Sequence, residues 1–359
     1  MKACHAVLQI LVWATVAYGQ STDSEKLRQA GLGEYAKGHF AEAKTLLSDA
    51  LKYDRENKVD RDIALDLSAL GDIYIIEQRR NEAELAYTEA LSIFSRLPDG
   101  TLLEATTLRN LASVYSGEQK YKEALAALHK ASKLAGKNKL GGDVFESQIL
   151  NTFGLIYFAQ GKLKQAETSF KHAAQTMMAP AIKPNPDLAQ SLHNLAVVLQ
   201  SRGKYQDAED LYTKSLKLTE ELYGPSHRDL ARMLNNFGLL YLRIGRYNDA
   251  ESQLRRSLAI LEETVPQPAG LMIETLHGLG KTYLYKGDKA GAEVFLVRAV
   301  ELSRQNPGHD PAVLTVFDTY RQLLQSNGDL ETAKQIDAEA KHIRAVMSLT
   351  VPGGASAKW

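Results

Sequence analysis

The segment LAVVLQSRGKYQDAEDLYTKS (residues 195–215) is followed 42 residues later by FGLLYLRIGRYNDAESQLRRS (residues 237–257). Both segments contain a glycine at their ninth position, an alanine five residues after it and a serine at the end. The same arrangement recurs at intervals of 40 to 42 residues, around Gly38, Gln78, Gln119, Gly161, Gly203, Gly245, Gly287 and Gly328. A fixed period of this length indicates an array of about eight helical hairpins, each with its turn at one of these residues.

Small and large residues recur at fixed distances from each turn. Small residues lie seven before, five after and twelve after it, as do Gly238, Ala250 and Ser257 around Gly245. Large residues lie four before and nine after it, as do Tyr241 and Leu254. Because these positions recur at helical spacing, we expect the small residues to permit close helix packing and the aromatic residues to form the core between repeats.

The prolines agree with this division of the chain into hairpins. Proline interrupts a helix because it removes a backbone hydrogen bond and clashes with the preceding turn. Nine prolines lie 19 to 25 residues after a turn, where one hairpin connects to the next: Pro98, Pro180, Pro184, Pro186, Pro225, Pro266, Pro268, Pro307 and Pro311.

These residues resemble the tetratricopeptide repeat, with Leu195-Ala196 to Ser215 and Phe237-Gly238 to Ser257 as the best matches. The 42-residue period and the connector Leu222–His227 look like the kinesin light chain subtype. The resemblance covers about residues 24–347. It implies an all-α, right-handed α-solenoid (a TPR superhelix) of about eight helix-turn-helix repeats, in which the first helix of each hairpin lines a concave, partner-binding groove.

The two ends of the chain differ from the repeats. Lys2, the apolar run of residues 6–17 and the small-x-small sequence at residues 17–19 predict a secretory signal peptide over residues 1–19. An uncleaved N-terminal anchor is the alternative. We expect residues 20–349 to form the solenoid and residues 350–359 to be a disordered tail. The predicted protein is exported, periplasmic or secreted, in a bacterial setting, without stable membrane insertion after signal cleavage.

The composition gives little indication of catalysis. The chain has 43 basic and 43 acidic residues, so a nucleic-acid partner is not expected. The only cysteine, Cys4, lies within the predicted signal peptide. The sequence Gly278-Leu279-Gly280-Lys281-Thr282 lacks the first glycine of a phosphate-binding loop, because position 275 is threonine. We therefore predict no enzyme activity, no cofactor and no metal site, and His39 is among the histidines to which no ligand role is assigned.

Polar residues recur on the first helices, nine or ten residues before the turns. An asparagine amide carries both a donor and an acceptor, which suits a peptide backbone, although asparagine is a weak helix former. Either these amides bind an extended partner or they bond to the neighbouring repeat and stiffen the array. Basic residues around repeats six and seven favour a carboxylate. The predicted peptide- or protein-binding residues are Arg109, Asn110, Asn151, His193, Asn194, Arg232, Asn235, Asn236, Arg243, His277 and Lys281.

The predicted function is that of a non-catalytic exported scaffold that binds a partner protein or an extended peptide along its concave groove. Two alternatives belong to other classes. One is a self-associating structural envelope protein, in which a second copy of the chain is the partner. The other is a sensor that binds a small molecule inside the superhelix.

Overall fold

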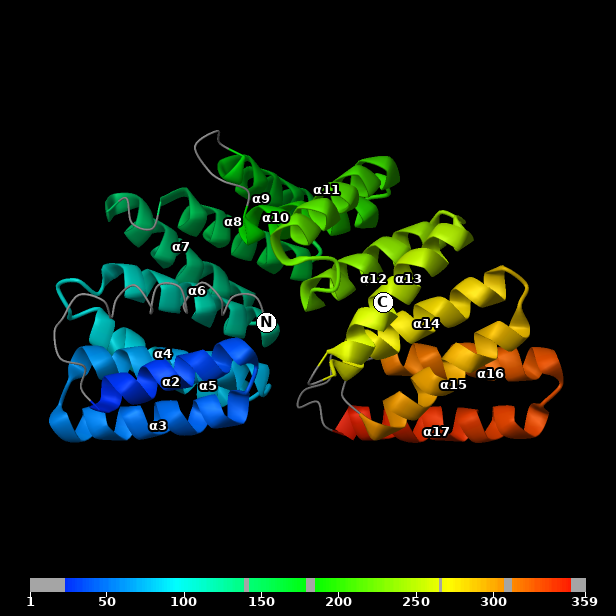
Figure 1. Cartoon of the computed structure of the whole chain (residues 1–359), viewed down its shortest axis with the longest axis horizontal. Helices are drawn as coiled ribbons and strands as arrows, with labels where there is room; N and C mark the ends of the chain where they lie inside the picture. Colours follow the sequence, from blue (N-terminus) through cyan, green and yellow to red (C-terminus); the bar gives the residue numbers. More distant parts are fainter. Residues whose placement is uncertain (1–22, 139–141, 179–184, 265–266, 307–311, 350–359) are drawn as a thin grey trace. The chain divides into compact units, whose positions relative to one another are not determined.

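The computed structural model describes residues 23–138, 142–178, 185–264, 267–306 and 312–349. Within these ranges the chain forms 16 helices and no strand, which confirms the predicted all-α class (Figure 1). The predicted signal peptide and tail lie outside these ranges. The helices are α2 (Asp23–Lys37), α3 (Phe40–Asn57), α4 (Asp60–Ile76), α5 (Arg80–Phe94), α6 (Thr101–Gly117), α7 (Tyr121–Asn138), α8 (Gly142–Ala159), α9 (Leu163–Met177), α10 (Pro186–Ser201), α11 (Tyr205–Tyr223), α12 (Arg228–Arg243), α13 (Tyr247–Glu263), α14 (Ala269–Tyr285), α15 (Lys289–Gln305), α16 (Ala312–Asn327) and α17 (Leu330–Leu349).

The chain divides into two compact units, Met1–Val198 and Leu199–Trp359. In the first unit α2 packs on α3, α4 on α5, α6 on α7 and α8 on α9. In the second unit α12 packs on α13, α14 on α15 and α16 on α17. Successive hairpins also contact each other within each unit, for example through α5 and α6 or through α13 and α14. None of the helices in the described ranges combines the length and apolarity needed to cross a membrane.

All eight predicted turn residues adopt the left-handed backbone conformation, with φ between 59° and 87°. Glycine adopts this conformation without a steric penalty, which explains why six of the eight turns carry it. The next residue donates its backbone N–H to a carbonyl five residues earlier, as Arg246 does to Tyr241 at 2.9 Å. Gln78 and Gln119 occupy the same conformation with a side chain, at φ 59° and 61°.

The small residue before each turn makes room for the large residue after it. A Cβ added to Gly71 would lie 2.6 Å from the Tyr87 ring, and one added to Gly154 would lie 2.5 Å from the Phe170 ring. The same contact in the second unit joins Gly238 to Leu254, at 2.6 Å. The spacing of small and large residues therefore records close contact between the two helices of a hairpin.

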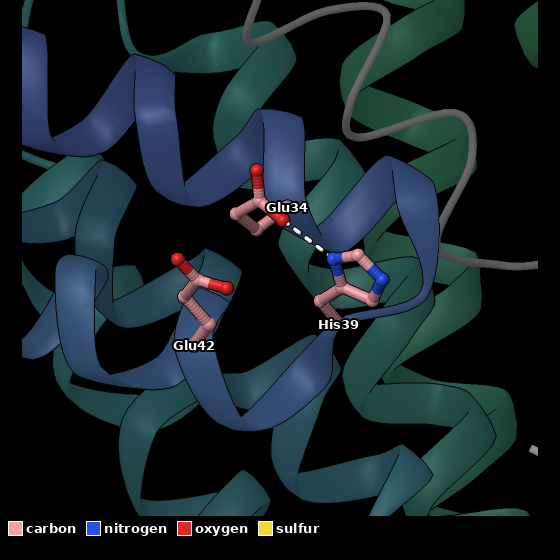
Figure 2. A group of neighbouring side chains, drawn as sticks. All are labelled: Glu34, His39 and Glu42. Carbon is pink, nitrogen blue, oxygen red and sulfur yellow. Dashed lines mark hydrogen bonds and ion pairs between the residues drawn. The ribbon is translucent and has the colours of Figure 1, made fainter.

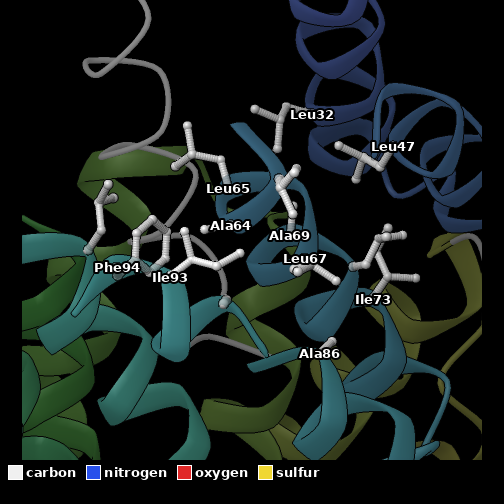
Figure 3. Close-up of a cluster of buried hydrophobic side chains, with 14 of the residues drawn as sticks. Leu32, Leu47, Ala64, Leu65, Leu67, Ala69, Ile73, Ala86, Ile93 and Phe94 are labelled. Carbon is white, nitrogen blue, oxygen red and sulfur yellow. The ribbon is translucent and has the colours of Figure 1, made fainter. Parts of the chain in front are cut away.

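Large apolar side chains form the core between hairpins. In the first unit Leu32 of α2, Leu47 of α3, Ile73 of α4 and Phe94 of α5 belong to one buried cluster (Figure 3). Burial of such side chains stabilises a fold by about 1.5–3 kcal/mol each, before the cost of ordering the chain. The predicted packing role of the apolar residues is confirmed for this cluster.

The tyrosines before the turns also make polar contacts between repeats. Glu209 on α11 accepts a hydrogen bond from the Tyr241 hydroxyl at 2.9 Å and forms an ion pair with Arg246 at 2.8 Å. The Arg246 guanidinium lies over the Tyr241 ring, 4.4 Å from its centroid. Tyr283 and Lys286 bind Glu251 in the same way one repeat later. Tyr241 and Tyr283 thus combine packing with a hydrogen bond to a glutamate of the preceding repeat, a contact that the apolar pattern does not reveal.

Candidate protein-binding face on the first helices

Asp72 on α4 is a buried carboxylate that joins three helices of the first unit. Its Oδ1 accepts hydrogen bonds from the Tyr87 hydroxyl on α5 and from Asn110 Nδ2 on α6, the latter at 3.0 Å. Burial raises the pKa of Asp72 to about 7, although both hydrogen bonds act to lower it. Asn110, predicted to bind a partner, is 4% exposed and its amide bonds within the protein.

Arg109 extends this network toward the following repeats. Its guanidinium donates to Asn110 Oδ1 at 3.3 Å and to Gln148 Oε1 on α8 at 2.7 Å. Gln148 Nε2 in turn donates to Asp187 at 3.3 Å. Arg109 is also buried. Its hydrogen bond to Gln148 links the successive first helices α6 and α8, which is the second of the two roles considered for these polar residues.

The residues ten before a turn form a ladder between first helices. Asn151 on α8 donates to the Ser191 hydroxyl on α10 at 2.6 Å. In the second unit the Thr275 hydroxyl on α14 donates to Asn235 Oδ1 on α12 at 3.0 Å. Both asparagines are buried, and Asn235 Nδ2 has no hydrogen-bond partner among the described residues. Their contacts are those of amides that stiffen the array. A partner-binding role for Asn151 and Asn235 stays a prediction.

In repeats five and six the neighbouring position, nine before the turn, is more accessible than it is in repeat three, where the buried Asn110 occupies it. His193 is 3% exposed, whereas the adjacent Asn194 is half-buried and accepts a hydrogen bond from Gln190 at 2.6 Å. Asn236 on α12 is half-buried as well. Because a half-buried amide can still contact a ligand, Asn194 and Asn236 fit the binding role better than the residues of the buried ladder.

One face of α12 carries two exposed arginines beside Asn236. Arg232 and Arg243 are eleven residues apart, which places them on the same side of a helix about 16 Å apart. Among the described residues neither makes a hydrogen bond or an ion pair. Lys281, on the adjacent α14, is half-buried. Glu274, at the α14 position equivalent to Arg232, is exposed and reduces the positive charge.

His277 on α14 is held as a neutral side chain. Its Nε2 lies 2.8 Å from the Thr319 hydroxyl on α16. Burial, together with the nearby Lys281 ammonium, lowers the pKa of His277 to about 4. Its observed contact is again with the next first helix, so its predicted role in binding a partner has no direct support from this geometry.

A buried charge cluster in the first unit could not be found from the sequence. Arg28 on α2 is 1% exposed and bonds to Asp66 Oδ1 at 2.6 Å, Asp54 Oδ2 at 2.5 Å and Asp62 Oδ1 at 3.2 Å. Burial raises the pKa of Asp66 to about 7, against the lowering effect of Arg28. The cluster ties α2, α3 and α4 together. Arg28 lies 26 to 38 residues before the three aspartates in the sequence, so no local pattern indicates that they meet.

Comparisons with known proteins agree with this architecture. A tetratricopeptide repeat profile matches residues 103–178 and 187–263, and a second one matches residues 273–306. No match was found among curated proteins.

Several solved structures are similar to this chain at low sequence identity, and the first two below share its fold. The apo form of the quorum sensor NprR from B. thuringiensis is 14% identical, with a TM-score of 0.63, over 94% of this chain and 91% of that one. BtubC (BKLC) from P. vanneervenii is 21% identical, with a TM-score of 0.58, over 65% of this chain and 94% of that one. A putative kinesin light chain from Podosopora anserina is 17% identical, with a TM-score of 0.49, over 57% of this chain and 98% of that one.

The profile matches fall on the helical hairpins observed from α6 to α15, and together they cover more than half of the chain. The eight left-handed turns, the small residues at the helix contacts and the tyrosines before the turns follow the same pattern. The chain therefore belongs to the tetratricopeptide repeat family.

Proposed function

We propose that this chain is a non-catalytic scaffold that binds an extended, acidic segment of a partner protein along the first helices of its repeats. The observation that carries the proposal is the exposed face of α12, which presents Arg232 and Arg243 near the half-buried Asn236. Neither arginine makes a hydrogen bond or an ion pair with another described residue. Arginine side chains bind carboxylates through paired, charge-assisted hydrogen bonds. An amide between them can hold the partner's backbone.

The buried contacts supply the rigidity that such a site needs. Asn235, next to Asn236, is bonded to Thr275 on the following first helix. This bond restrains α12 against α14 before a partner arrives. Because less freedom is lost on binding, a preorganised surface gains affinity without additional contacts. The buried ladder and the accessible face thus have complementary roles in the proposal.

The proposed setting is outside the cytoplasm, after removal of residues 1–19. This proposal depends on the apolar run of residues 6–17 and the small residues that follow it. N-terminal sequencing of the protein recovered from a cell-envelope fraction tests it. A chain that begins at Gln20 supports export with cleavage, whereas one that retains residues 1–19 supports the uncleaved anchor.

The binding proposal is tested with charge-removing variants of α12. An Arg232→Ala/Arg243→Ala chain and a control Lys214→Ala chain, changed at an exposed position of α11, are used to capture proteins from the organism's own envelope extract. We expect a partner that the wild type and the control retain and the double variant loses. Affinity for that partner should fall as salt is raised, because exposed charges are screened.

Equal capture of the partner by all three chains would show that the binding site does not include Arg232 and Arg243 of α12. If no partner is captured and the chain associates with itself in light scattering, the self-associating alternative replaces the proposal.

A further inference from the structure

The turn of the first hairpin brings together three side chains with metal-binding atoms. Glu34 lies near the end of α2, His39 immediately precedes α3, and Glu42 lies in the first turn of α3 (Figure 2). One ligand atom from each lies within 4.8 Å of the others. Among the described residues this is the only group of three or more histidine, cysteine or acidic side chains placed closely enough to hold an ion.

The other turns carry different side chains at the same positions. In repeat two the residues equivalent to Glu34 and His39 are Tyr74 and Arg79, and the guanidinium lies 4.8 Å from the tyrosine centroid. In repeat six Tyr241 and Arg246 make the same contact at 4.4 Å. Those turns contain a cation over an aromatic ring. Only the first turn pairs a carboxylate with an imidazole there, so the metal-binding set is not a by-product of the repeat pattern.

The two carboxylate oxygens of Glu34 contact different side chains, and one of them faces His39. Lys37 binds Oε1 at 2.6 Å, and His39 Nδ1 lies 2.6 Å from Oε2 (Figure 2). Hydrogen bonds from Lys37 and His39 hold the pKa of Glu34 below its usual range, so the group is a carboxylate at neutral pH. A metal ion bound by Oε2 and Nδ1 would replace this contact, while Lys37 remains bound to Oε1.

The third ligand can reach the same point. Glu42 is exposed, so its carboxylate can change rotamer without disturbing a packed neighbour. Ligand atoms about 2.1 Å from a tetrahedral ion lie about 3.4 Å apart. Glu34 Oε2 and His39 Nδ1, which are 2.6 Å apart, must therefore separate by about 0.8 Å, and Glu42 must approach from a separation of up to 4.8 Å. His39 and Glu42 are both exposed, so their side chains can make these movements without disturbing a packed neighbour.

We propose that Glu34, His39 and Glu42 form a binding site for a divalent transition-metal ion of the zinc type. The imidazole selects such ions over Mg²⁺ and Ca²⁺, which prefer all-oxygen ligands. The two carboxylates neutralise the ion's charge. Three protein ligands leave a fourth position for water or for a donor atom from another molecule. Bound metal would link the end of α2 to the start of α3.

Calorimetric titration of the full chain with zinc chloride tests the site, using His39→Ala and Glu42→Gln as site variants. The control is His172→Ala, which removes an exposed histidine from α9. We expect one zinc ion per chain for the wild type and the control. Each site variant should bind at least about tenfold more weakly, since loss of even an outer-shell partner commonly has that effect. Lys37→Met should bind zinc at least as tightly as the wild type, because it removes a competing cation.

Three results would overturn the proposal: no zinc binding by the wild type, equal binding by His39→Ala and His172→Ala, or equal affinity for zinc and Mg²⁺. Circular dichroism of each variant checks that its helices are retained. None of these outcomes depends on the partner proposed for α12.

Discussion

Replacement of Arg28 by methionine should destabilise the first hairpin more than any exposed charge substitution. Methionine approximates the length of the side chain but removes its charge and its five donors. Asp54 and Asp66, at 1% and 0% exposed, would remain buried without the guanidinium that binds them. Asp62, which is partly exposed, would lose its ion pair as well.

The expected loss follows from the burial of the charges. Removal of one partner from a buried ion pair typically costs about 3–5 kcal/mol, because the remaining charge is left uncompensated. Protonation offers partial relief, since Asp66 already has a pKa raised to about 7 by burial. A raised carboxyl pKa contributes stability that is present below about pH 4 and is lost as pH rises through 7. The variant should therefore be more strongly destabilised at pH 8 than at pH 5.

Hydrogen exchange measured by mass spectrometry reports the free energy of local opening. Amides of α2 and α3 should exchange about 100-fold faster or more in Arg28→Met than in the wild type at pH 8, after correction for intrinsic rates. Amides of α14 and α15, in the other unit, serve as the internal reference. Arg61→Met is the matched control, because Arg61 pairs with the exposed Asp99 and such pairs contribute about 0–1 kcal/mol.

The reasoning is refuted if Arg28→Met changes the opening free energy of α2 and α3 by less than about 1 kcal/mol, or by no more than Arg61→Met does. A chain that also carries Asp54→Asn and Asp66→Asn separates the loss of charge compensation from the loss of packing. It should recover much of the stability, since neutral amides no longer need a cation.

Three further predictions concern single positions. Asp72→Asn should reduce the loss of stability between pH 5 and pH 8. Burial raises the pKa of Asp72 to about 7, so the stability that its protonated form contributes is lost as pH rises through this range. Thermal melts from pH 5 to pH 8 measure the change. His277→Asn should reduce the loss of stability as pH falls from about 6.5 to 4, since the pKa of His277 is lowered to about 4, and the same melts apply. Gln78→Gly should raise the stability to urea by about 1 kcal/mol, because it relieves a left-handed backbone at φ 59°.

Each prediction has a result that contradicts it. An Asp72→Asn chain with the pH profile of the wild type would place the titrating group elsewhere. Unchanged acid sensitivity in His277→Asn would show that this histidine is not held neutral by burial. A Gln78→Gly chain that unfolds at lower urea concentration would mean that the glutamine side chain stabilises its turn more than the backbone strain opposes it.

The hairpin array was predictable because its signals are local. The left-handed conformation at a turn favours glycine at that one position, so the signal is local. All eight turns lie where the repeat period predicts them. Each close contact between two helices joins a small and a large residue of the same hairpin, such as Gly154 and Phe170. Tyr241 was correctly predicted to pack. Its bond to Glu209 was missed, although glutamate recurs six residues after several turns, at Glu84, Glu209 and Glu251.

The candidate site could be predicted only in part. The recurrence of amides on the first helices was visible, but the two roles considered for them use the same residue type. Burial separates them: Asn235 bonds to the next first helix, whereas Asn236 remains half-buried. The unbonded arginines of α12 were among the predicted residues, but exposure and lack of partners are properties of the folded chain.

By itself, the sequence determined the repeat length, the places of the turns and the positions of close packing, because each depends on residues within one hairpin. Tertiary structure decided which polar groups meet across hairpins. The contacts of Arg28 with Asp66, of Asn110 with Asp72 and of Glu34 with His39 and Glu42 arise only when separate helices pack or a chain reverses. Their energies depend on burial and distance, and these quantities exist only once the helices have packed together.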